Sequence, residues 1–280
     1  MTLATLAEVL QPALKRGYAV GGLVTLGWED TRAYVAAAEA EGLPVILQAG
    51  PSCRAHTPLP LLGKMFRYLA EEAIVPVVAH LDHGYTFEEC KIALESGFTS
   101  LMFDGSRTPL QQNIDDTAQI AEMAHAAGIS CEGEIGFVGY SEGEESKGTD
   151  PGEAARFAAE TGVDAMAISV GNVHLQQNRE GGLDEPRICA IEAVTDVPLV
   201  IHGGSGVPLA QRSHLARTSS ICKFNIGTEL RIAFGAALRE TLARDTDSFD
   251  RVKLLSPVEA PITAAARAAL RTLAPEGDTL

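Results

Sequence analysis

The chain has 280 residues, 46% of them hydrophobic, and this length suits either one large α/β barrel or two smaller domains. With 22 Lys and Arg residues against 37 Asp and Glu residues, the net charge is −15, and there is no dense basic run of the kind that contacts nucleic acid. No apolar stretch approaches the roughly 18 residues that a membrane span needs. We therefore expect no nucleic-acid or membrane partner. Because the overall field repels anions, any anionic ligand must be held by local groups.

The first 20 residues carry apolar side chains at helical spacing, without a basic start or a continuous apolar core. They predict an amphipathic helix rather than a targeting signal. The five cysteines are far apart, form no C-x-x-C pair and lie mostly in apolar segments, as buried free thiols do. This usage is typical of a reducing compartment, and we expect the protein to be cytoplasmic.

Eight short apolar runs, bounded by Gly, Pro or polar residues, then alternate with Ala-rich segments of helical periodicity. The expected strands are Tyr18–Leu26, Pro44–Ala49, Pro76–Leu81, Phe98–Phe103, Ile129–Glu134, Asp164–Val170, Pro198–Gly203 and Ile221–Ile226. Eight strand–helix units favour a closed (β/α)8 TIM barrel over an open sheet, and no G-x-G-x-x-G follows the first strand. We expect one α/β domain over residues 1–280, with extra helices at the N and C termini.

Ionisable side chains gather where these strands end, which is where TIM-barrel enzymes carry their chemistry. The third strand ends in HLDHG, which contains His80, Asp82 and His83, and the sixth and seventh strands lead to His174 and His202. One histidine at a strand end is more often structural, but three neutral imidazoles from separate strands can converge on a divalent ion and leave it a free position for substrate. These residues predict a catalytic metal centre. His80 shares a strand face with Asp82, and we assign it a supporting role.

Other polar residues near the strand ends differ in what they indicate. Asp104 ends the fourth strand and Glu134 the fifth, so both lie close to the expected metal centre. Lys223 lies on the eighth strand and does not by itself indicate Schiff-base chemistry. The remaining histidines, His56, His125 and His214, fall away from the strand ends, and we assign them no function.

Two Gly-containing junctions predict a phosphate site. In VIHGGSG, at the end of the seventh strand, the glycines have no side chains, so an anion can approach the backbone N–H groups. In FNIGTEL, the last residues begin a helix whose dipole favours negative charge. The first motif alone would also fit a tight turn, but phosphate sites between strands seven and eight are common in barrels. The residues assigned to this site are Gly203, Gly204, Ser205, Asn225, Gly227 and Thr228.

The chain from about residue 5 to residue 235 resembles the class II fructose-bisphosphate and tagatose-bisphosphate aldolases. The resemblance lies in these motifs, in this order: GYAV, PVILQ, HLDHG, SLMFDGS, EGEIG, GVDAMAISVGNVH, VIHGGSG and KFNIGTELR. The resemblance implies that His83, His174 and His202 bind a catalytic Zn²⁺ ion, one per subunit, although another divalent ion would also fit. It implies that Asp82 is the acid/base at the hydroxyl whose carbon–carbon bond breaks. The phosphosugar substrate would be a ketose 1-phosphate or a ketose 1,6-bisphosphate of the fructose or tagatose type, which yields dihydroxyacetone phosphate and an aldehyde.

The same resemblance places three further carboxylates. Asp104 and Glu134 match carboxylates near the metal and give a possible second metal position. Glu142 lies on the long loop GFVGYSEGEESKGTDPG after the fifth strand and matches a mobile proton-transfer glutamate. The family also implies a homodimer or homotetramer, in which C-terminal residues can reach a neighbouring subunit's site. Candidates for that role are Arg251, Arg267 and Arg271.

The sequence departs from the family pattern on one side of the pocket. Val24 stands where the first strand usually carries asparagine, and Gly50 stands where a polar residue often follows PVILQ. Leu175 follows His174 where the family usually has glycine. We therefore expect the ketone-phosphate side to be kept, and an aldehyde other than glyceraldehyde 3-phosphate, without a phosphate of its own, to be used.

Two other functions remain open at this stage. One is a non-catalytic phosphosugar-binding accessory subunit, which would have no need for a base such as Asp82 beside a metal. The other is a metal-dependent sugar-phosphate epimerase or isomerase on the same scaffold, which would share the metal ligands. Product analysis separates the epimerase from the aldolase, because only the aldolase yields two smaller carbon fragments.

Overall fold

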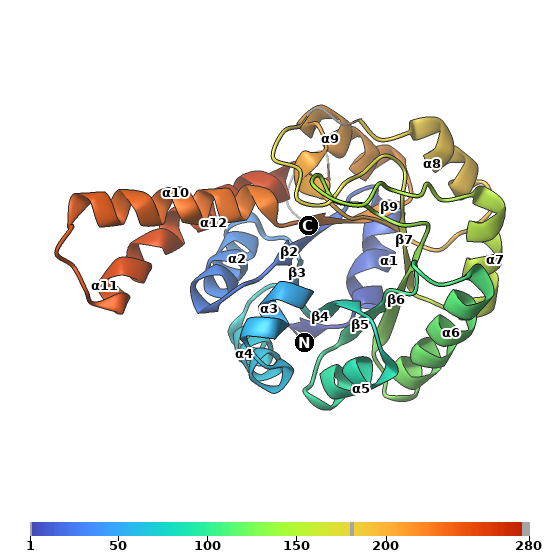
Figure 1. Ribbon diagram of the computed structural model, residues 1–280, viewed down its shortest axis with the longest axis horizontal. Coiled ribbons are helices and arrows are strands. Elements are labelled where there is room, and N and C mark those ends of the chain that lie inside the picture. Colours follow the sequence, from blue (N-terminus) through green and yellow to red (C-terminus); the bar gives the residue numbers. More distant parts are fainter. Residues whose placement is uncertain (1, 180–181, 276–280) are drawn as a thin grey trace.

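The computed structural model describes residues 2–179 and 182–275, and its eight parallel barrel strands confirm the predicted TIM barrel (Figure 1). These strands are β2 (Val20–Val24), β3 (Val45–Ala49), β4 (Val77–Gly84), β5 (Ser100–Phe103), β6 (Ser130–Ile135), β7 (Ala165–Ile168), β8 (Leu199–Ile201) and β9 (Ile221–Ile226). They follow one another in the order β4-β3-β2-β9-β8-β7-β6-β5, and pairing of β4 with β5 closes the ring. A short strand that the sequence did not predict, β1 (Leu3–Ala4), pairs with the start of β4.

Helices surround the barrel, and their positions agree with the Ala-rich segments of the sequence. They are α1 (Leu6–Arg16), α2 (Trp28–Glu41), α3 (Pro51–His56), α4 (Leu59–Glu72), α5 (Phe87–Glu95), α6 (Leu110–Ala126), α7 (Pro151–Thr161), α8 (Glu185–Glu192), α9 (Leu209–Thr218), α10 (Thr228–Arg244), α11 (Arg251–Leu255) and α12 (Glu259–Arg271), with 3-10 turns η1 (Gly204–Gly206) and η2 (Ser256–Val258). None of the helices in the described residues is long and apolar enough to cross a membrane.

Two apolar cores hold this architecture together. The larger lies between the strands and the outer helices, and the smaller fills the barrel interior. Helix α1 covers the interior core at the amino end of the barrel. Its Leu6, Val9 and Leu10 pack in the same cluster as Ile46 and Val78 of the strands. Thr5 and Glu8 form a capping box that starts this helix. Each such buried side chain contributes about 1.5–3 kcal/mol, so the amino end of the barrel is closed by packing and the carboxyl end is left for chemistry.

The C-terminal region forms a helical arm. Helix α10 runs out from the barrel, α11 lies at its far end, and α12 returns to pack on α2 and α10 (Figure 1). Arg267 and Arg271 of α12 make ion pairs with Glu41 of α2 in the same chain. The prediction of a helical tail is confirmed, and these two arginines already have a partner within the chain.

Candidate active site

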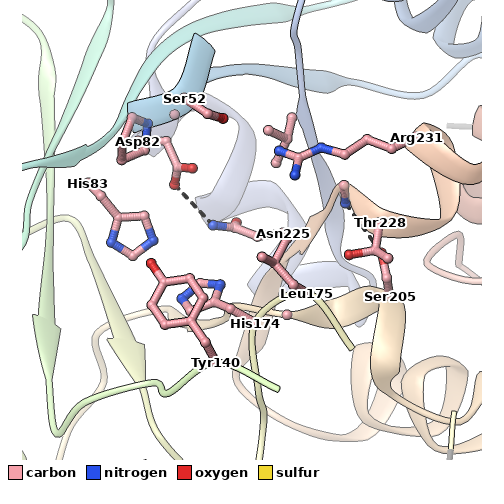
Figure 2. A pocket seen from close by; sticks show the side chains of 15 residues that line it. Ser52, Asp82, His83, Tyr140, His174, Leu175, Ser205, Asn225, Thr228 and Arg231 are labelled. Carbon is pink, nitrogen blue, oxygen red and sulfur yellow. Dashed lines mark hydrogen bonds between the residues drawn. The ribbon is translucent and has the colours of Figure 1, made fainter. Parts of the chain in front are cut away.

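A cavity of about 280 Å³ opens at the carboxyl ends of the strands (Figure 2). It contains the predicted base, two of the three predicted metal ligands and most of the predicted phosphate residues. Its lining comprises Val24, Gly50, Pro51, Ser52, Asp82, His83, Tyr140, His174, Leu175, Gly203, Ser205, Asn225, Gly227, Thr228 and Arg231. His202 lies directly behind this surface and is fully buried.

The three histidines converge as the sequence predicted. Their ring nitrogens lie within 4.8 Å of one another, and Nε2 of His83 is 3.1 Å from Nδ1 of His202. Carboxylates fix the tautomers of these two rings. Nδ1 of His83 is 2.8 Å from Asp104 and Nε2 of His202 is 3.2 Å from Glu132. Because a carboxylate only accepts, each ring donates a proton there and directs its other nitrogen to the shared centre.

This arrangement fits a divalent metal ion. The 3.1 Å between Nε2 of His83 and Nδ1 of His202 is close to the separation of about 3.3 Å between two ligands that each lie about 2.0–2.1 Å from a tetrahedral zinc ion. Burial lowers the pKa of His174 to about 3 and holds the pKa of His202 well below its usual value, so both rings are neutral, as metal ligands must be. Burial opposes protonation of His83 as well, yet Asp82 and Asp104 raise its pKa to about 10, so a proton competes with a metal there.

A second group of possible ligands lies beside the first. His83, Asp104 and Glu134 also bring one ligand atom each within 4.8 Å of one another. Burial, reinforced by the charge of Asp104, raises the pKa of Glu134 to about 8. Its Oε2 atom is buried and has no hydrogen-bond partner among the described residues. A cation beside Glu134 would stabilise its ionised form and would give the buried Oε2 atom a partner. This fits the second metal position expected for these carboxylates.

Asp82 lies next to the three histidines with one oxygen anchored and the other free. Its Oδ1 accepts from Nε2 of Gln48 at 2.9 Å. The same Oδ1 accepts from Nδ2 of Asn225 at 3.3 Å (Figure 2). A Cβ atom on Gly50 would lie 3.2 Å from Oδ2, which places that oxygen on the Gly50 side of the cavity. Burial opposes ionisation, but His83 and His202 lower the pKa of Asp82 below its usual value, so the group is ionised at neutral pH and is in the form that can accept a proton.

Backbone geometry at the metal ligands is unusual. His83 and Leu175 are the two non-glycine residues with positive φ, at 54° and 58°, within residues 2–179 and 182–275. His83 sits at a register shift of β4, and the Arg54 guanidinium donates to the carbonyl oxygens of Asp82 and His83. This buried clamp holds a conformation that non-glycine residues rarely adopt. Leu175 stands where relatives are expected to have glycine, and its φ accounts for that preference.

His174 depends on the long loop after β6. Its backbone N–H donates to the carbonyl of Gly139, and its carbonyl accepts from Ser141. Tyr140 stacks on the His174 ring with centroids 5.0 Å apart and lines the cavity. Glu142 lies further along this loop, in a neighbouring surface depression, so the structure does not bring it into the cavity.

The phosphate residues surround the start of α10. Gly203 has φ 66°, and a Cβ atom there would lie 2.2 Å from the carbonyl oxygen of Val173, so only glycine fits. The Ser205 hydroxyl accepts from the backbone N–H groups of Gly227 and Glu229 at 3.3 Å each. Gly204 lies between Gly203 and Ser205, at the start of the turn η1. Gly227 and Thr228 line the cavity, so the positive end of the 17-residue helix α10 lies at its wall.

Four residues of this region had no assigned role in the sequence analysis. Gln48 lies in the apolar strand β3 and Arg54 in helix α3. Tyr140 is on the long loop after β6, and Arg231 is one turn into α10. Arg231 extends into the cavity opposite the histidines, as Figure 2 shows, and its Nε atom is buried without a partner among the described residues. The signal for Arg231 was present, because it ends the KFNIGTELR motif, three residues after Thr228 and on the same helix face.

Comparison with known proteins agrees with this geometry. The model of the family described as fructose-bisphosphate aldolase class-II matches residues 4–278. The chain belongs to this family. Class II aldolases are lyases, and the family is generally metal-dependent. This aldolase is 39% identical over 264 residues to the fructose-bisphosphate aldolase of Geobacillus stearothermophilus, covering 92% of each chain.

Two further similarities show how varied the relatives of this aldolase are. It is 39% identical over 263 residues to the 6-phospho-5-dehydro-2-deoxy-D-gluconate aldolase of Shouchella clausii, covering 91% of this chain and 89% of that one. Among solved structures, the YdjI aldolase from Escherichia coli K12 superposes with a TM-score of 0.86 at 29% identity, covering 98% of both chains. Two relatives with the same sequence identity to this chain, 39%, are therefore named for different substrates.

Proposed function

We propose that this class II aldolase cleaves a ketose 1-phosphate into dihydroxyacetone phosphate and an aldehyde, with a divalent ion, Zn²⁺ by preference, held by His83, His174 and His202. The observation that carries the proposal is the meeting of three ring nitrogens within 4.8 Å, beside the free oxygen of Asp82, in one cavity. When bound, the ion stabilises the negative charge that develops on the ketone fragment, an effect worth several kcal/mol.

Asp82 removes the proton from the C4 hydroxyl. Its Oδ2 is free, while Gln48 and Asn225 hold Oδ1 and so fix the direction of the carboxylate. Loss of this proton lets the C3–C4 bond break, the aldehyde leaves, and the electron pair stays on the ketone fragment until C3 is reprotonated.

The phosphate of the ketone fragment is held at the start of α10. Gly203, Gly204, Ser205, Gly227 and Thr228 supply backbone and hydroxyl groups, and the helix dipole favours the dianion. Arg231 is the one Lys or Arg side chain among the described residues that line the cavity, and it adds a positive charge beside them. This local set of donors meets the expectation from the net charge of −15 that an anion must be held by nearby groups.

Glu142 reprotonates C3 in this proposal, as its place on the loop after β6 suggests. That role requires the loop segment around Glu142 to approach the cavity, which Tyr140 of the same loop already lines. A Glu142→Gln substitution should lower the rate of cleavage while leaving zinc binding unchanged. Substrate protons at C3 that exchange with solvent at the wild-type rate in E142Q would assign this step to another group.

The aldehyde side of the pocket has little polarity. Val24, Gly50 and Pro51 line it, together with the Ser52 hydroxyl. We infer that the enzyme accepts an aldehyde without its own phosphate. Comparable kcat/KM for fructose 1,6-bisphosphate and for a matched ketose 1-phosphate supports this inference, and a strong preference for the bisphosphate contradicts it.

A retro-aldol screen tests the central proposal. Ketose 1-phosphates and bisphosphates are supplied one at a time, and release of dihydroxyacetone phosphate is followed with a coupled dehydrogenase. Cleavage should disappear with EDTA and return with Zn²⁺. A protein that binds phosphosugars without turnover would be an accessory subunit instead, and a single isomeric product of unchanged carbon number would indicate an epimerase.

We also propose that the protein is a homodimer or homotetramer. The arm of α10 and α11 extends beyond the barrel in Figure 1, and Phe249 and Val252 on it are 96% and 70% exposed. At its base lies a cavity of about 650 Å³ that includes Trp28, Tyr68 and Arg251. Exposed apolar side chains that gather on one projecting arm, rather than singly over the surface, favour a partner surface. Light scattering measures the mass directly, and a monomer at micromolar concentration contradicts the proposal.

A further inference from the structure

A chain of polar side chains crosses the barrel interior directly beneath the active site. It runs from Ser100 through His80, Lys223 and Glu132 to His202, and each of these residues comes from a different strand or its end. The successive distances are 2.8 Å, 3.3 Å, 2.7 Å and 3.2 Å. All five side chains are fully buried. The chain therefore ends on a ring nitrogen of a metal ligand.

Stability does not account for the charged members of this chain. Lys223 and Glu132 form an ion pair that is removed from water, where desolvation offsets most of the attraction between the charges. Apolar residues of the same volume at such positions usually keep or increase stability. The neighbouring interior layer, with Val78, Met102 and Val200, is already apolar. We therefore look for a functional role that requires the buried charges of Lys223 and Glu132.

Both oxygens of Glu132 are engaged, so the carboxylate cannot rotate. Oε2 accepts from Nζ of Lys223, and Oε1 faces Nε2 of His202. Lys223 is held in turn, because its ammonium group also donates to Nε2 of His80, whose other ring nitrogen bonds to Ser100. Because Oε1 of Glu132 accepts from Nε2, this arrangement favours the tautomer of His202 whose Nδ1 is unprotonated. That Nδ1 lies 3.1 Å from Nε2 of His83 and 3.6 Å from Oε2 of Glu134.

We propose that Glu132 is a positioning residue for His202 and that Lys223 holds Glu132 in place, so that the pair sets the affinity of the metal centre. The inference rests on the proposed metal centre and concerns residues outside the cavity lining. Carboxylates that orient a ligating histidine typically change metal affinity about 10–100-fold when removed.

The test measures the zinc Kd by competition with a chromogenic chelator on the full-length protein, together with the visible spectrum of the Co²⁺-loaded form and the urea midpoint. The variants are Glu132→Gln, Glu132→Asp, Lys223→Met and the double variant E132Q/K223M. Glu132→Asp keeps the charge but withdraws it from His202 by one methylene group. Thr161→Val is the control, because Thr161 is buried and hydrogen-bonded in α7, away from every metal ligand.

We expect the zinc Kd to rise about tenfold or more in E132Q and in E132D, with an altered Co²⁺ spectrum, while Thr161→Val loses stability alone. The double variant has no unpaired buried charge, so its urea midpoint should return toward the wild-type value while zinc binding stays weak. Wild-type zinc affinity in folded E132Q and E132D would overturn the inference, and E132D decides the matter if E132Q does not fold.

The controls separate this inference from the function on which it rests. His202→Ala should lose zinc binding whatever the role of Glu132. If wild-type protein binds no zinc, or if H202A binds it as tightly as wild type, the proposed metal centre is wrong and the inference falls with it. If both behave as expected and the Glu132 variants match wild type, the inference alone is wrong.

Discussion

Asp82→Asn isolates the proton-transfer step from the rest of the site. The asparagine has the same shape, and its single oxygen can still accept from Gln48 and Asn225, which lie 2.9 Å and 3.3 Å from Oδ1 in the wild-type protein. What disappears is the free basic oxygen on the Gly50 side. General bases contribute about 10²–10⁴-fold to rate, so we expect kcat to fall about 10³-fold, equivalent to about 4 kcal/mol of transition-state stabilisation.

Steady-state kinetics with the preferred ketose phosphate, together with zinc content, provide the assay for Asp82→Asn. KM should change little, since Asp82 contributes to the transition state rather than to phosphate binding, and the three histidines should keep their metal. Asp150→Asn is a matched control, because Asp150 caps α7 and asparagine caps nearly as well. The reasoning is refuted if D82N keeps more than about a tenth of the wild-type kcat at full zinc occupancy.

Three further predictions concern the binding surfaces of the cavity. Arg231→Met should raise KM for a ketose 1-phosphate about tenfold or more while kcat changes little; an unchanged KM would remove Arg231 from the phosphate site. Gly50→Ala places a methyl group 3.2 Å from Oδ2 of Asp82, so kcat/KM should fall about tenfold or more without loss of thermal stability. Gly203→Ala should reduce both folding yield and activity, because its Cβ atom would meet the Val173 carbonyl at 2.2 Å; soluble, active G203A protein would contradict this.

The fold and the meeting of the three histidines were accessible from the sequence because both depend on local patterns. All eight predicted barrel strands overlap the strands of the structure, and a residue at the carboxyl end of a barrel strand necessarily faces the same mouth. His83, His174 and His202 were therefore placed together without any knowledge of their distances. The two-residue strand β1 was missed because it is too short to show periodicity.

The supports of the site were not accessible in the same way. Glu132 and Lys223 are 91 residues apart in the chain, and nothing in either strand indicates that their side chains meet inside the barrel. Gln48 lies in an otherwise apolar run, where a polar residue carries no periodic signal. Arg54 acts on backbone carbonyl groups, and sequence patterns do not identify such acceptors. These contacts follow from closure of the ring, which brings together strands distant in sequence.

The first barrel strand gives an example in which an apparent loss is a structural requirement. Its glycines read as a weak point in a strand, and Val24 stands where a polar contact was expected. In the structure, a Cβ atom on Gly22 would lie 1.9 Å from Oε1 of Gln48 and 2.9 Å from Oδ1 of Asn225. These are the two amides that hold Asp82. A side chain at position 22 would displace both of them, so the missing side chain on β2 leaves the space that the two amides holding Asp82 occupy.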